Sequence, residues 1–115
     1  GENGTLVSKD LINYKHNFLQ LSCYTSDKKN KKTNYLLTID LDTTQIYNRK
    51  KILADESIIT DDTIEFTMNK YYNHSVMKMK HIINRADGIF YVHMEVGTAK
   101  KIDSGMCKKF TKNAF

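Results

Sequence analysis

The feature that most constrains the fold of this chain is an alternation of apolar and polar residues at every second position. It is clearest in residues 63–68, where Ile64, Phe66 and Met68 alternate with two threonines and a glutamate. Successive side chains of a β-strand point to opposite faces, so this pattern predicts a strand with one buried face. Residues 35–41 and 89–96 alternate in the same way and are also predicted to be strands.

The rest of the chain predicts an all-β domain. Clusters of Asp, Asn, Gly and Lys, which are typical of turns, separate further short strands that are expected at residues 45–48, 52–54, 57–60 and 105–110. Because 115 residues is the length of one domain, residues 1–115 are expected to form a single antiparallel meander, as a small barrel or a sandwich. The exception is the amino-terminal stretch, where Ser8 is placed to cap a short helix that runs through Phe18.

One hairpin can be predicted in register. Residues 76–84 and 89–96 are both strand-like, and Gly88 before the second strand can take the left-handed conformation of a tight turn. Gly88 in that position sets the facing pairs, which are Ile83 with Phe90, His81 with Val92, Met79 with Met94 and Met77 with Val96. These side chains share the apolar face, whereas His93 lies on the other face. We therefore expect His81 to be a hydrogen-bonded core residue that cannot meet His93 at one metal or substrate.

The two cysteines, Cys23 and Cys107, lie near opposite ends of the chain in strand-like surroundings. Two cysteines in a small domain allow one disulfide, and the alternative is two buried free thiols in a cytosolic protein. Neither cysteine belongs to a CxxC motif or to a zinc-binding spacing. We favour the disulfide and therefore an oxidising compartment, periplasmic or secreted. The first residues do not resemble a signal peptide, so an exported protein is expected to have lost it.

The net charge of +5 does not by itself point to nucleic acid. Of the 18 basic residues only Arg49 and Arg85 are arginines, which carry the planar group that reads guanine and phosphate with paired hydrogen bonds. The lysines lie mainly in predicted turns and near the carboxyl end, where charge runs are commonly just solvated. A small basic nucleic-acid-binding protein, or a ribonuclease-type toxin, therefore remains the alternative function. No apolar run approaches the roughly 20 residues that a membrane-spanning helix needs.

No motif of a known enzyme class is present in the sequence. It contains no HExxH, GxSxG, GxGxxG or Walker loop. Asp40 and Asp42 lie two residues apart on one face of a strand end, as a cation site or an acid–base pair would require. Asp is equally typical of the turn that ends a strand. We favour the turn, and we expect no catalytic residue, no metal and no cofactor.

The carboxy-terminal half resembles small exported bacterial β-proteins. Residues 84–88 read Asn-Arg-Ala-Asp-Gly, which fits an Asn-Arg-x-x-Gly hairpin, and residues 105–107 fit a terminal Gly-x-Cys strand. Residues 86–91 are also similar to the Ser-Gly-x-x-Tyr loop of the periplasmic C-type lysozyme inhibitors, with Gly88 and Tyr91 at matching positions. The resemblance implies an antiparallel β-barrel with a disulfide and a loop that enters an enzyme cleft. Asp87 stands where that family has its inserting serine, and like charges disfavour a basic lysozyme as partner.

The function predicted from these patterns is binding without catalysis. We expect an exported protein-binding module, such as an enzyme inhibitor or an immunity-type protein that neutralises a toxin. A rigid hairpin presents its loop at low entropic cost, so the binding residues are expected in the hairpin of residues 85–91, at Arg85, Asp87, Gly88 and Tyr91. A structural subunit or surface adaptor is a third hypothesis, which stable oligomerisation would indicate.

Overall fold

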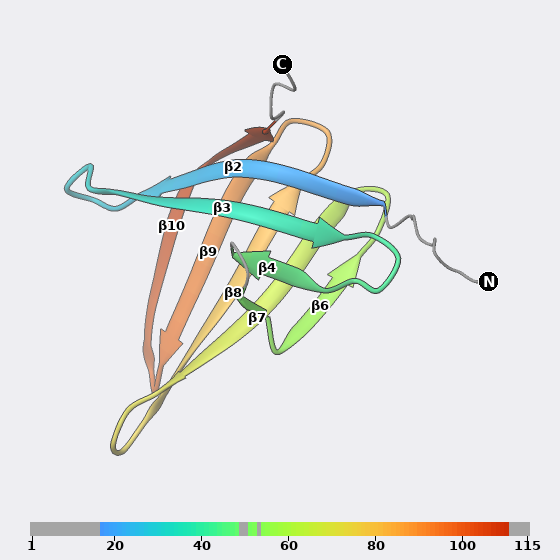
Figure 1. Cartoon of the computed structure of the whole chain (residues 1–115). Coiled ribbons are helices and arrows are strands. Elements are labelled where there is room, and N and C mark those ends of the chain that lie inside the picture. Colours follow the sequence, from blue (N-terminus) through green and yellow to red (C-terminus); the bar gives the residue numbers. More distant parts are fainter. Residues whose placement is uncertain (1–16, 49–50, 53, 111–115) are drawn as a thin grey trace.

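The computed structural model describes residues 17–48, 51–52 and 54–110, and these residues form one antiparallel sheet that curls into a nearly closed barrel (Figure 1). The strands are β2 (Phe18–Ser26), β3 (Lys32–Asp40), β4 (Ile46–Asn48), β5 (Lys51–Ile52), β6 (Glu56–Ile59), β7 (Thr63–Tyr71), β8 (Val76–Asn84), β9 (Ile89–Val96) and β10 (Ala99–Lys109). The all-β prediction is confirmed. Within the described ranges no helix is long and apolar enough to cross a membrane.

The sheet consists of two antiparallel meanders, β2 to β5 and β6 to β10, and the pairing of β10 with β2 joins them. Its strand order is β5-β4-β3-β2-β10-β9-β8-β7-β6, so β10 pairs with β2 on one side and with β9 on the other. The two ends of the sheet meet where the hydroxyl of Ser57 in β6 donates a hydrogen bond to the carbonyl of Thr44, in the turn between β3 and β4. This contact brings the two ends of the sheet together without a shared ladder.

The interior of the barrel is filled by alternate residues of the strands, as the sequence pattern predicts. Ile64 and Phe66 are buried, whereas their neighbours Thr63 and Glu65 are half-buried. The remaining buried apolar residues are Leu21, Cys23, Leu37, Ile39, Ile46, Ile83, Phe90, Val92 and Cys107. The predicted register of the β8–β9 hairpin is confirmed pair by pair, from Ile83 with Phe90 to Met77 with Val96.

The amino-terminal prediction is wrong where the structure describes it. Phe18 does not end a helix but begins β2, where it pairs with Asp40 of β3, and the Asn17 carbonyl accepts a hydrogen bond from the Leu41 amide at 2.9 Å. Pairing with a neighbouring strand outweighs a local capping signal, because propensity is weak beside tertiary contacts. The rest of the predicted helix, residues 8–16, lies outside the described residues.

The carboxy-terminal strand is longer than predicted. The sequence predicts a strand at residues 105–110 after an irregular segment, whereas β10 begins at Ala99 and pairs with β9 along that segment. Residues 99–102 are all exposed, so they carry no alternation that could reveal a strand. Their partner strand decides their conformation.

The predicted disulfide is confirmed. Cys23 and Cys107 are bonded, and they lie directly opposite each other in the β2–β10 ladder with Cα atoms 4.0 Å apart. The bond therefore links two strands that are 84 residues apart in sequence. Both cysteines are buried, so the bond is part of the core.

Candidate binding site

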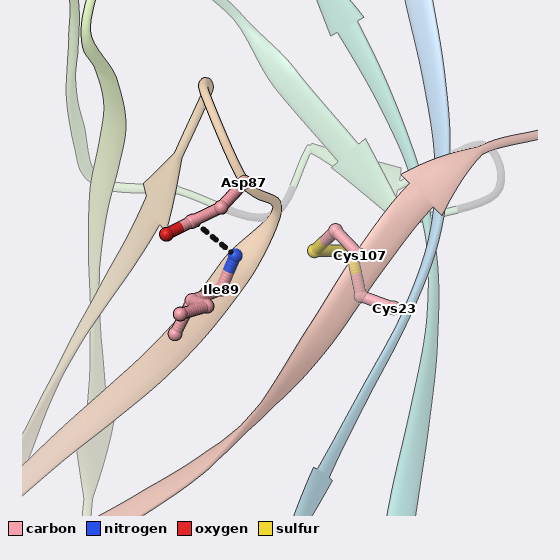
Figure 2. Close-up of a disulfide and its surroundings, with 4 residues drawn as sticks. All are labelled: Cys23, Asp87, Ile89 and Cys107. Atoms are coloured by element: carbon pink, nitrogen blue, oxygen red, sulfur yellow. Dashed lines mark hydrogen bonds between the residues drawn. A yellow bond between two sulfur atoms is a disulfide. The ribbon is translucent and has the colours of Figure 1, made fainter.

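The β8–β9 turn is shaped by its own polar side chains. The Oδ1 atom of Asn84 accepts hydrogen bonds from the backbone amides of Ala86, at 2.8 Å, and Asp87, at 3.3 Å. The Oδ1 atom of Asp87 accepts one from the amide of Ile89 at 2.9 Å (Figure 2). Asn and Asp favour turns because they bond the backbone in this way. The turn therefore holds its shape without help from a partner.

Arg85 connects this turn to the neighbouring loop between β6 and β7. Its backbone amide donates to the carbonyl of Asp62 at 2.8 Å, and its Nη1 donates to the carbonyl of Thr60 at 2.6 Å. The residue is still exposed, with further guanidinium donors on the same fork. Arg85 thus has a fixed position from which it can bind a carboxylate or a phosphate.

Gly88 is required by the backbone at this place. Its φ angle is +79°, the left-handed conformation that the sequence predicts for it, and a Cβ atom here would collide with the carbonyl oxygen of Cys107. The amide of Cys107 also donates to the Gly88 carbonyl at 2.7 Å. The turn is therefore hydrogen-bonded to the strand that carries the disulfide, and Figure 2 shows Asp87 and Ile89 of this turn near that disulfide. Gly88 positions the turn and offers no side chain to a partner.

The turn borders a recess of about 620 Å³ at this end of the barrel. The floor of the recess is apolar and includes Leu21, Ile64 and Ile83. Its edge carries charged residues, which we call the rim: Arg85, Asp87, Lys108 and Lys109, all exposed. With three cations and one anion, the rim favours an anionic surface.

Tyr91 does not lie with the other three predicted binding residues. It points to the outer face of β9, where its ring contacts that of His93 edge-on at 6.4 Å between centroids, and it does not line the recess. It is 39% exposed. The structure thus groups Arg85, Asp87 and Gly88 at the recess and separates Tyr91 on the barrel wall.

The aspartates that the sequence offered as a pair act in a turn. The Oδ1 atom of Asp40 accepts hydrogen bonds from the amides of Asp42, at 2.9 Å, and Thr43, at 3.1 Å. This is the strand-ending arrangement that the sequence favours. In the described part of the chain no three His, Cys, Asp or Glu side chains gather as ligands for a metal.

Sequence reasoning missed a second group of residues inside the barrel. His81, Met68, Met79 and Met94 line a cavity of about 350 Å³, which we call the methionine cavity. The sequence places Met79, Met94 and His81 on one face, but Met68 joins them only through the pairing of β7 with β8. A signal for that pairing was available, since a hairpin closed between residues 71 and 76 puts Met68 opposite Met79.

His81 is buried as predicted, but it is not the hydrogen-bonded core residue that the sequence suggested. Neither ring nitrogen has a hydrogen-bond partner among the described residues, because aromatic rings surround it. Phe66 stacks on it at 4.4 Å between centroids, and Tyr35 meets it edge-on at 5.9 Å. Burial lowers its pKa to about 4. The backbone of Phe66 and of Met79 approaches the imidazole without the geometry of an ordinary hydrogen bond, and it offsets only part of the shift. The imidazole is therefore neutral at pH 7.

Comparison of the chain with protein families, with curated proteins and with solved structures finds no match.

Proposed function

We propose that this chain is an exported, non-enzymatic protein-binding module, of the inhibitor or immunity type, that contacts its partner through the rim. The observation that carries the proposal is the β8–β9 turn, whose backbone is held by internal hydrogen bonds while Arg85 and Asp87 are exposed. A surface that is already ordered loses little conformational entropy when it binds. The disulfide supports an oxidising compartment.

The charges of the rim indicate the kind of partner. The rim carries three cations, Arg85, Lys108 and Lys109, and one anion, Asp87, and the chain as a whole carries +5. Charge complementarity accelerates encounter with a partner of opposite sign and slows it with one of the same sign. We therefore propose a partner protein with an acidic surface.

The test is a charge reversal at the rim. Partners are captured from an extract of the source organism on immobilised protein, identified by mass spectrometry, and titrated against purified variants. We expect Lys108→Glu with Lys109→Glu to lower affinity by at least about tenfold, mainly through slower association. The matched control is Lys28→Glu with Lys29→Glu, which changes the net charge equally in the exposed β2–β3 turn, away from the recess.

The outcomes separate the hypotheses. Equal affinities for the rim variant, the control and the parent protein would refute the rim as the binding surface. Retention of RNA or DNA on filters, with a steep salt dependence that the rim variant abolishes, would replace the protein partner by nucleic acid. Loss of partner binding in Tyr91→Ala would extend the contact from the rim onto the wall of β9.

A further inference from the structure

Three methionines lie in a row inside the barrel. Met68 of β7 pairs directly with Met79 of β8, which in turn pairs directly with Met94 of β9. Side chains of directly opposite residues start about 5 Å apart, and all three line the methionine cavity. His81 lies two residues beyond Met79 on the same face of β8 and lines it too. Thioether and imidazole donors from adjacent strands therefore border one space.

A second observation, independent of the methionines, also indicates a ligand: the buried imidazole of His81 has no hydrogen-bond partner among the described residues. His81 has no exposed surface, and both of its nitrogens lack a hydrogen-bond partner among the described residues. Buried polar groups without a partner are rare and cost free energy. Contacts with Phe66 and Tyr35 hold the ring in place but satisfy neither nitrogen. A ligand that accepts a nitrogen lone pair would remove this cost.

We propose that the methionine cavity binds a single cuprous ion, Cu(I), through the thioether sulfurs of Met68, Met79 and Met94 and a ring nitrogen of His81. Thioethers are soft ligands that select Cu(I), and imidazole binds copper well. Hard divalent cations such as Ca²⁺ and Mg²⁺ prefer oxygen ligands instead. This site is separate from the rim and does not depend on the function proposed there.

Binding changes no oxidation state. Thioethers carry no proton, and the ion enters and stays as Cu(I), so no electron is transferred. Thiolates would compete for Cu(I), but both cysteines are held in the disulfide.

The ion has a route into the site. The cavity extends from buried His81 to Thr33 and Lys70, which are exposed, and its methionines are only half-buried. Asp103 also lines the cavity, and its carboxylate lies 3.8 Å from the ammonium of Lys101. The side of the cavity that carries Thr33 and Lys70 is therefore the way in from solvent.

Anaerobic titration tests the proposal directly. Cu(I) is supplied as its acetonitrile complex to the intact disulfide-bonded chain, in competition with a coloured Cu(I) chelator. We expect one equivalent to be retained, and Met79→Leu or His81→Phe to weaken retention by about tenfold or more. Leu has nearly the volume of Met, so Met79→Leu is expected to fold. The matched control, Met106→Leu, changes an exposed methionine outside the cavity and is expected to bind as the parent does.

A measurement on the unmodified protein removes any dependence on variants. Ag(I), which like Cu(I) is a diamagnetic d10 ion, is titrated while the methionine methyl resonances are recorded by NMR. We expect the resonances of Met68, Met79 and Met94 to shift and that of Met106 to stay. No retention of Cu(I) against the chelator, equal retention by Met79→Leu, or a shift confined to Met106 would each overturn the site. Equal binding of Zn²⁺ would overturn the choice of Cu(I).

Discussion

The rim and the methionine cavity differ in whether their polar groups are hydrogen-bonded. The β8–β9 turn contributes Arg85 and Asp87 to the rim. In this turn, Asn84 and Asp87 each accept hydrogen bonds from backbone amides, and Arg85 donates one to the carbonyl of Thr60. In the methionine cavity, His81 is buried with both nitrogens unbonded within the described structure. A turn whose polar groups are satisfied keeps its shape alone, which suits recognition of another surface. A buried imidazole without a partner destabilises the folded chain, which suits a site that a small ligand completes.

The largest expected effect comes from removal of the disulfide between Cys23 and Cys107, which lies beside the rim. Replacing Cys23 and Cys107 with Ala should lower the free energy of unfolding by about 4–5 kcal/mol, because the bond closes a long loop in the unfolded chain. The bond also lies beside the β8–β9 turn, since Cys107 donates its amide to Gly88. Urea unfolding measures the loss, and amide exchange locates it.

We expect amides of residues 84–89 to exchange faster in the double variant while those around Met79 change less. Equal acceleration at both places would mean that the disulfide stabilises the barrel uniformly, and the contrast between the rim and the methionine cavity would fail on this point.

The next effect is a pH dependence that belongs to the methionine cavity. His81 has a folded-state pKa of about 4, against about 6.5 when unfolded. Between these values the unfolded chain binds the extra proton, so stability is full above pH 6.5 and falls as the pH drops toward 4. The total loss is about 3 kcal/mol. Urea unfolding between pH 7 and pH 4.5 measures it.

His81→Phe is the matched control for this titration. It keeps an aromatic ring beside Phe66 and removes the two unbonded nitrogens, so it should be more stable than the parent at pH 7 by about 1–3 kcal/mol. Carboxylates titrate in both proteins, and only the difference between the two curves reports His81. Parallel curves would show that His81 is solvated or bonded in the folded state.

The smallest effect tests the hydrogen bond that the Asp87 side chain accepts within the β8–β9 turn. Asp87→Ala removes the acceptor of the Ile89 amide and should cost about 0.5–1.5 kcal/mol. Asp87→Asn keeps an oxygen acceptor and should cost less, although it removes the same charge. Thermal unfolding compares the two. An equal cost for both variants would assign the effect to charge and not to the hydrogen bond.

The parts of the fold that could be predicted are those with a local signal. The alternation of residues 63–68 and the left-handed Gly88 specify a strand and a turn, and both are confirmed. The predicted binding residues share a short segment of the sequence. In the structure, however, Arg85 belongs to the rim, whereas the Tyr91 side chain lies on the outer face of β9. An alternating strand turns every second side chain away, so nearness in sequence did not place these residues at one site.

By itself, the sequence determined the all-β class, the β8–β9 register and the left-handed conformation of Gly88. The carbonyl of Cys107, which leaves no room for a Cβ at Gly88, comes from the tertiary structure. Only the tertiary structure decided that β10 lies between β2 and β9, which places Cys107 opposite Cys23. It also decided that Met68 joins Met79 and Met94 beside an unbonded His81. The physical reason is that turn chemistry and alternation act over a few residues, whereas the neighbours of a side chain inside a barrel depend on which strands pair.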